Sequence, residues 1–186
     1  MLDSFFFGYG SLVNTSTHGY VDTAPAILKG WHRFWTSVPN RETAVLSIRP
    51  NAGQVIKGLI ARVPGSDWID LDLRETGYGR KNVTKLVSCE LQKPKCCAAY
   101  IFKSYETAGI VQKTPILMSY LDVVVQGFLQ IYGESGAKHF FKTTDGWDRG
   151  IKNDRLDPVY PRACKLNANE TQLIDELLNE HGAKIV

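Results

Sequence analysis

Two carboxylates, Asp72 and Glu75, stand where acid–base chemistry is possible. The segment 65–77 has the spacing of a helix, and at about 100° per residue Glu75 falls on the same side as Trp68 and Leu71. An apolar residue is expected at that position. Asp72 falls beside Glu75, so we predict that both carboxylates face a sheet rather than solvent.

Burial gives a carboxyl group at this position unusual proton affinity. A buried carboxylate loses hydration, which raises its pKa, and the negative end of the helix near Glu75 acts in the same direction. Such a group exchanges protons near neutral pH, as a general acid or base must. A structural role is the alternative, in which Glu75 pairs at the helix end with Arg74, Arg80 or Lys81.

A second element with possible chemistry is the sequence FGYGSL at residues 7–12. The run 5–7, three phenylalanines, predicts a short strand buried on both faces, and the glycines at 8 and 10 permit backbone conformations that a side chain would forbid. Successive backbone N–H groups in such a turn form a concave site for a carboxylate or a developing oxyanion. Ser11 is either a turn hydroxyl or a nucleophile, but no motif links a histidine to it.

These elements together are similar to a known family. The stretches FGYGSL (7–12), LDLRETGYGRKNV (71–83) and CAAYIFKSYE (97–106) resemble, in order and spacing, the γ-glutamylcyclotransferase-like superfamily. The resemblance implies a small barrel, a YGSL-type loop at the end of the first strand, and one glutamate that acts as both acid and base. Glu75 is the residue that matches this catalytic glutamate.

The same resemblance assigns binding of the substrate's γ-glutamyl group to the loop residues Tyr9, Gly10, Ser11 and Leu12. Two further aromatic positions near the pocket are matched by Tyr78 and Tyr100, which either contact the substrate or pack within the barrel. The region after residue 145 has the character of a long loop. Its side chains at Arg155, Tyr160 and Arg162 either cover the pocket or belong to a solvated connection.

The activity that the resemblance implies is that of a γ-glutamyl cyclotransferase. The α-amine of a γ-glutamyl substrate attacks its own γ-carbonyl, forms 5-oxoproline and releases an amine, an amino acid or a peptide, with no cofactor. The sequence does not distinguish γ-glutamyl amino acids, glutathione and γ-glutamylamines, because all share the half that cyclises. The alternatives are a non-catalytic small-molecule-binding or interaction protein on the same fold, and a hydrolase with Ser11 as nucleophile.

The elements that must position these residues predict an α+β fold. The pattern of β-branched and aromatic runs predicts further strands at 26–38, 43–50, 54–64, 80–91 and 96–105. Helical spacing predicts helices at 65–77, 115–133, 135–144 and 169–182. Pro115 takes the first position of the long helix, and Asn169 is the N-cap of the last helix. Since strands come first and helices later, we expect a mixed, mainly antiparallel sheet curled into a small β-barrel with flanking helices, in a single domain over 1–186.

The composition of the 186-residue chain favours a cytoplasmic small-molecule protein. Its formal charge of +3 is scattered, which does not favour a nucleic-acid partner. We expect neither a membrane span nor a signal peptide, because no apolar stretch is long enough and the N-terminus lacks a basic flank. The four cysteines fit neither a disulfide framework nor a zinc spacing, so we expect buried reduced thiols, and the dispersed histidines predict no metal site. The oligomeric state is not indicated.

Overall fold

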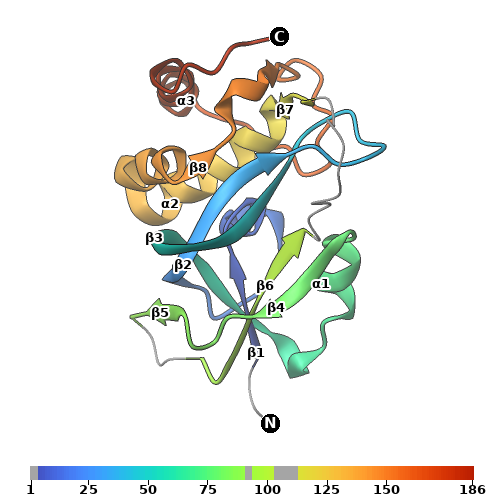
Figure 1. Ribbon diagram of the computed structural model, residues 1–186, viewed down its shortest axis with the longest axis vertical. Helices are drawn as coiled ribbons and strands as arrows, with labels where there is room; N and C mark the ends of the chain where they lie inside the picture. Colours follow the sequence, from blue (N-terminus) through green and yellow to red (C-terminus); the bar gives the residue numbers. More distant parts are fainter. Residues whose placement is uncertain (1–3, 91–93, 103–112) are drawn as a thin grey trace.

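The structure, a computed structural model, describes residues 4–90, 94–102 and 113–186 and has the predicted α+β composition (Figure 1). In chain order its strands and α-helices are β1 (Ser4–Gly8), β2 (Ala24–Thr36), β3 (Val45–Val63), α1 (Ile69–Arg74), β4 (Tyr78–Asn82), β5 (Val87–Cys89), β6 (Cys96–Phe102), β7 (Ile116–Leu117), α2 (Met118–Lys142), β8 (Thr144–Asp145), β9 (Ile151–Lys152) and α3 (Ala168–Glu180).

The main sheet is mixed and mainly antiparallel, as predicted. Its strand order is β4-β6-β1-β3-β2-β5, with β8 beside β2. The pairs β1–β6 and β2–β8 are parallel, and the other pairs of this sheet are antiparallel. Within the described residues the sheet runs from one edge at β4 to the other at β5 and does not close into a barrel.

Two of the predicted strand boundaries are wrong. The strands predicted at 43–50 and 54–64 are one long strand, β3. The residues between them, 51–54, lie opposite Gly30 at a bulge, where the register between β2 and β3 shifts. Both Gly30 and Gly53 have positive φ, which lets the two strands continue through the irregularity. The strand predicted at 80–91 is divided into β4 and β5 by a turn in which Leu86 N–H donates to Val83 O.

The helix boundaries also need correction. The helices predicted at 115–133 and 135–144 are two halves of α2, divided where Gly133 adopts a φ of 64°. This helix starts at Met118 rather than Pro115, because residues 116 and 117 pair with β9. The cap of α3 is Asn167 rather than Asn169: Asn167 Oδ1 accepts the N–H of Glu170, and the Glu170 carboxylate accepts the N–H of Asn167.

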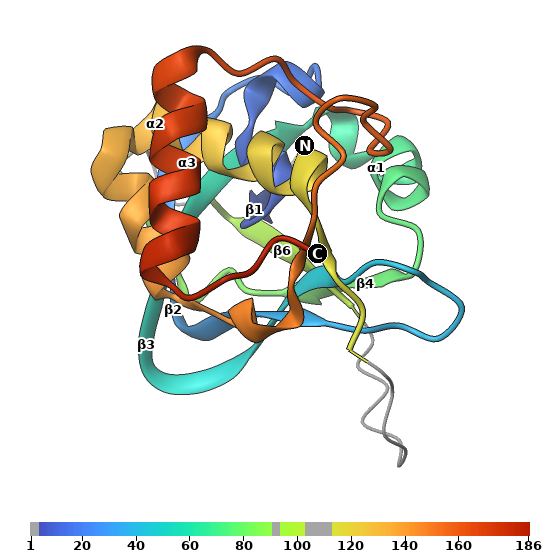
Figure 2. The same ribbon diagram turned by 90° about the horizontal axis from the view of Figure 1, so that it is seen from above.

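Strand β1 is buried on both faces, which the three phenylalanines predict. Phe7 packs in the large core with Phe128 of α2, while Phe6 packs in a second cluster with Leu71 of α1. Helices α1 and α2 therefore cover different sides of the sheet (Figure 1), and α3 packs on α2 through Leu177 (Figure 2). The end of β1 is thus held rigidly between two layers.

The four cysteines are thiols, and burial is complete only for Cys97. Burial raises the pKa of the Cys97 thiol to about 12. The prediction of buried thiols is therefore right for Cys97, whereas Cys89, Cys96 and Cys164 are half-buried. Over the described ranges of the chain, no helix combines the length and apolar character needed to cross a bilayer.

Candidate active site

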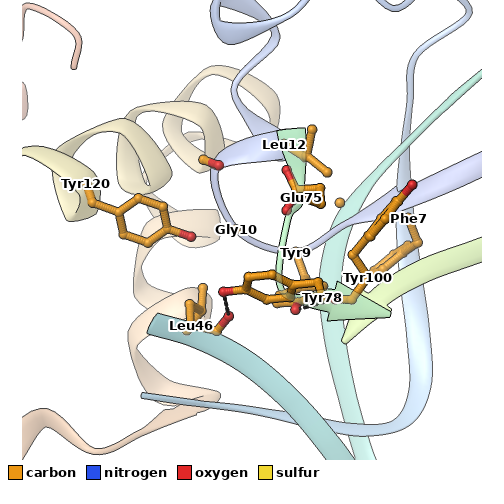
Figure 3. A pocket seen from close by; sticks show the side chains of 11 residues that line it. Phe7, Tyr9, Gly10, Leu12, Leu46, Glu75, Tyr78, Tyr100 and Tyr120 are labelled. Carbon is orange, nitrogen blue, oxygen red and sulfur yellow. Dashed lines mark hydrogen bonds between the residues drawn. The ribbon is translucent and has the colours of Figure 1, made fainter. Parts of the chain in front are cut away.

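The residues that the resemblance assigns to the site all lie around one narrow pocket at the end of β1 (Figure 3). The pocket is lined from the loop by Tyr9, Gly10, Ser11 and Leu12, from α1 and β4 by Glu75 and Tyr78, and from β6 by Tyr100. Segments more than 60 positions apart in the sequence therefore meet at this place, as the resemblance implies.

The loop after β1 is a tight turn that leaves its backbone facing the pocket. Val13 N–H donates to Gly10 O at 2.9 Å, and Ser11–Val13 forms one 3₁₀ turn. A Cβ on Gly10 would lie 2.9 Å from the Tyr120 hydroxyl oxygen, and a Cβ on Gly8 would lie 2.8 Å from Leu12 Cβ. Neither glycine has a positive φ. At Gly8 the neighbouring atoms include the Leu12 backbone, so close approach requires a glycine there. At Gly10 the neighbouring atoms are the ends of the Tyr120 and Leu46 side chains, and the backbone has φ −129° and ψ −131°.

A buried arginine binds the backbone of this loop. Arg33 is fully buried and its Nε donates to Tyr9 O at 2.9 Å, while its other nitrogens donate to Thr143 Oγ1 and Lys57 O. Its guanidinium lies 5.0 Å from the ring centre of Phe128. Burial lowers the pKa of Arg33 to about 9, so the group keeps its charge at neutral pH. The backbone of the loop is therefore fixed by a charged hydrogen bond.

Glu75 ends α1 and points into the pocket (Figure 3). Its N–H donates to Leu71 O at 2.9 Å, and its side chain is only 16% exposed. Leu71, on the same side of the helix, is completely buried, as the helical spacing predicts. The ion pair at the helix end, which is the alternative structural role of Glu75, is also present, because Arg74 Nε lies 3.2 Å from Glu75 Oε1. Arg74 is in turn held by hydrogen bonds to Thr17.

The surroundings of Glu75 change its proton affinity. Burial raises the pKa of its carboxyl group, and the nearby guanidinium groups of Arg74 and Arg162 offset this only in part. The net direction is upward, toward neutrality. A carboxyl group with this behaviour, at the wall of a cavity, is suited to take up and release protons.

The prediction that Asp72 faces the sheet rather than solvent is right only in part, because Asp72 bonds to residues of β4 and β6 but is also exposed and does not line the pocket. Its side chain is 44% exposed, it lies 3.0 Å from Arg80 Nε, and it accepts a hydrogen bond from the Tyr100 hydroxyl. Arg80 belongs to β4, which runs beside the short helix, so Asp72 is directed toward that strand and not into the pocket. Glu75 is left as the carboxylate of this pocket among the described residues.

Four tyrosines surround Glu75, and burial raises the pKa of each phenol, so all are neutral near pH 7. Tyr9 donates to the carbonyl oxygen of Tyr100 at 2.5 Å, and Tyr78 donates to Leu46 O at 3.0 Å. Tyr78 and Tyr100 thus line the pocket while their hydroxyls bind protein groups, and their contact with a substrate stays a prediction. Tyr120, from α2, was not predicted, because no local motif marks it.

The serine of the loop has no catalytic partner in the described part of the chain. Ser11 is buried, and no histidine ring is hydrogen-bonded to it there. The nearest candidate along the chain, His18, instead directs its Nε2 to Leu12 O at 3.2 Å. This arrangement does not resemble the serine–histidine geometry of a hydrolase.

A wider pocket of about 280 Å³ opens beside the inner one and shares Glu75 and Tyr120 with it. Tyr160 and Arg162 line this outer pocket, so both reach the site as one of the two interpretations of their loop predicts. Arg155 does not line it. Its guanidinium forms ion pairs with Asp122 and Asp175.

Comparison with known proteins confirms the resemblance to the γ-glutamylcyclotransferase-like superfamily. Residues 4–115 match the family described as "ChaC-like protein", and the chain belongs to that family. No curated protein matches the chain.

The chain is also similar in fold to several solved structures. One, titled "Gamma-glutamyl cyclotransferase", has a TM-score of 0.57 at 17% identity, covering 94% of this chain and 99% of that one. YkqA from Bacillus subtilis has a TM-score of 0.57 at 19% identity, covering 78% of this chain and 57% of that one. An uncharacterized protein of Homo sapiens, loc79017, has a TM-score of 0.56 at 15% identity, with coverages of 94% and 99%. At these identities the likeness concerns the fold.

Proposed function

We propose that the protein is a γ-glutamyl cyclotransferase, which converts a γ-glutamyl substrate to 5-oxoproline and a free amine. The observation that carries the proposal is the position of Glu75: a buried carboxyl group with a raised pKa, in one pocket with the glycine loop. Membership of the ChaC-like family and a fold shared with a γ-glutamyl cyclotransferase support it.

In this mechanism Glu75 acts as base and then as acid. Its carboxylate takes a proton from the substrate's α-ammonium, and the freed amine attacks the γ-carbonyl carbon to form the new C–N bond. As the old C–N bond breaks, Glu75 delivers this proton to the departing nitrogen. The attacking nitrogen loses one more proton, so that 5-oxoproline keeps a single N–H and the released amine ends as its ammonium form. A positioned acid–base group typically contributes ~10²–10⁴ in rate. Because the nucleophile is tethered, alignment adds an effective molarity on the order of 10⁵–10⁸ M.

The loop has the task of holding the γ-glutamyl group in its bent conformation. Gly8 and Gly10 allow the backbone to lie at the pocket wall, where amide groups can meet a charged or developing oxygen. Arg33 fixes that backbone through Tyr9 O. The neutral phenols of Tyr9 and Tyr120 keep the surroundings of Glu75 free of a second negative charge.

The ion pair with Arg74 is compatible with this role. A carboxylate that burial alone acted on would hold its proton too tightly to serve as a base at neutral pH, and a nearby cation lowers its pKa. Arg74 is itself anchored to Thr17 by two hydrogen bonds, which hold it beside Glu75. We assign Arg74 the role of a positioning residue that sets the proton affinity of Glu75.

The test is incubation with γ-glutamyl amino acids, glutathione and γ-glutamylamines, with products followed by mass spectrometry. At least one compound should give 5-oxoproline and free amine in equal amounts, and Glu75→Gln should serve as the blank. Free glutamate as the product would indicate hydrolysis. Tight binding of the compounds without turnover would instead support the binding-protein alternative and overturn the proposed activity.

A further inference from the structure

The outer pocket carries more positive than negative charge. Its charged lining residues are Arg41, Arg74, Arg162 and Glu75. Glu75 is already paired with Arg74 at 3.2 Å. In the described part of the chain, no carboxylate lies within ion-pair distance of Arg41 or Arg162. Two arginines therefore line this pocket without a direct ion pair to the described part of the chain, although Arg162 is near enough to Glu75 to lower its pKa.

Arg162 is held at the pocket by the way its loop is attached. The Asp154 carboxylate accepts hydrogen bonds from the N–H of Ser119 at 2.7 Å and from Val159 N–H at 2.8 Å. Tyr160 N–H donates to Ser119 Oγ, and the Tyr160 ring meets Tyr120 edge-on at 5.0 Å. These contacts attach the loop to the start of α2. The attachment at Tyr160 is two residues before Arg162 in the sequence.

Arg41 lies on the connection between β2 and β3, which borders the same pocket. Its N–H donates to Val38 O at 3.1 Å, which closes a turn at the base of this connection. Its Nη2 reaches the end of α1, since a Cβ on Gly77 would lie 3.7 Å from it. The two arginines thus come from separate segments that border one pocket.

The position of Glu75 decides which half of the substrate meets these arginines. Glu75 lines both pockets, so the bond that it protonates must lie at their junction. With the γ-glutamyl group against the loop in the inner pocket, the leaving half must extend into the outer pocket. A guanidinium binds a carboxylate through charge-assisted hydrogen bonds, and two together give a preference for anionic ligands.

We infer that Arg41 and Arg162 bind a carboxylate on the leaving half, so that the protein selects γ-glutamyl amino acids or peptides over γ-glutamylamines that lack this group. The inference rests on the proposed cyclotransferase function. It concerns specificity: Arg41 and Arg162 bind the departing half, and the ratio between carboxylate and amide substrates reports on this contact separately from the effect of Arg162 on the pKa of Glu75.

The experiment compares substrates that differ only in the carboxylate. γ-Glutamylalanine and γ-glutamylalaninamide form one pair, and glutathione and its glycine amide form the other, which separates a near carboxylate from a distant one. For the wild-type protein we expect kcat/KM to favour the carboxylate member of at least one pair by about 10-fold, the effect of two partly exposed ion pairs. In the double variant Arg41→Met, Arg162→Met this ratio should fall below about 3-fold.

Arg49→Met is the matched control. Arg49 is also an exposed arginine, but it pairs with Asp145 away from both pockets, so its replacement should leave the ratio unchanged. The wild-type ratio should also shrink when salt is raised, because exposed charges are screened. Equal kcat/KM within both pairs for the wild-type protein, or an unchanged ratio in the double variant, would overturn the inference.

Calorimetric titration of Glu75→Gln with the same compounds separates this inference from the proposed function. If the wild-type protein turns over none of the four compounds and none of the γ-glutamylamines, the cyclotransferase proposal fails. The affinity ratio between carboxylate and amide members would still report on the arginines. Tighter binding of the carboxylate member, lost in the Arg41→Met, Arg162→Met background, supports carboxylate recognition, and equal affinities would refute it.

Discussion

Replacement of Glu75 by glutamine separates catalysis from structure. The amide has nearly the shape of the carboxyl group and fits a side chain that is 16% exposed, but it cannot carry a proton between two nitrogens. We expect the rate to fall by at least ~10², which is about 2.7 kcal/mol of barrier at about 1.36 kcal/mol per decade. Binding of a γ-glutamyl ligand should persist.

The second part of the prediction concerns the free energy of unfolding of Glu75→Gln. Glu75→Gln removes a charge whose burial is unfavourable, and Arg74 keeps its hydrogen bonds to Thr17 at 2.7 and 3.0 Å. We therefore expect the free energy of unfolding to change by less than about 1 kcal/mol. A purely structural ion pair behaves differently, because removal of one partner of a buried pair costs about 3–5 kcal/mol.

The assay measures both quantities on one preparation: 5-oxoproline formed per folded molecule, and thermal unfolding. Asp72→Asn is the control, since Asp72 is 44% exposed and pairs with Arg80 outside the pocket, and it should cost less rate than Glu75→Gln. Near-normal turnover by folded Glu75→Gln, with a large loss of stability, would refute the catalytic assignment.

Three further predictions follow from the same contacts. The rate should fall on acidification at a pH above the ordinary glutamate pKa, because burial raises the pKa of Glu75 and the base must be unprotonated. In Arg74→Met the loss of a neighbouring cation should move this fall to higher pH. A shift to lower pH in the pH–rate profile of this variant would contradict the assignment. Gly10→Val should abolish ligand binding in calorimetric titration, since its first side-chain carbon alone would lie 2.9 Å from the Tyr120 hydroxyl, and unchanged affinity of the folded variant would remove the loop from the site. Arg33→Met should lower the free energy of unfolding by at least ~3 kcal/mol, because three acceptors lose this donor in buried or partly buried surroundings. A loss below about 1 kcal/mol in denaturant titration would show that the hydrogen bonds to the loop are not important.

Much of the site could be predicted because its signals are local. The apolar positions 68 and 71 place Glu75 on the inner side of a helix, and this holds although α1 is only six residues long. The phenylalanines of β1 likewise indicate burial on both faces, which the clusters around Phe6 and Phe7 confirm. In both cases the periodicity of one element decides where a side chain points.

The features that could not be predicted depend on contacts between distant segments. Asp72 has the same helical position that suggests burial, but Arg80 on β4 draws it to the edge of the sheet. Tyr120 reaches the pocket only because α2 packs against the loop, and Arg41 only because the connection between β2 and β3 borders the same pocket. By contrast, the sequence alone could have identified Asn167 instead of Asn169 as the N-cap of α3, because Glu170 follows Asn167 three residues later.

The central claim is that the γ-carbonyl carbon is attacked by the substrate's own amine and not by water. The most direct measurement is turnover of a γ-glutamyl substrate in H₂¹⁸O, with 5-oxoproline, glutamate and free amine quantified by mass spectrometry. Intramolecular attack involves no water, so we predict 5-oxoproline without ¹⁸O, in an amount equal to the free amine. Glutamate that carries ¹⁸O in its γ-carboxylate, or 5-oxoproline labelled through such glutamate, would contradict the mechanism.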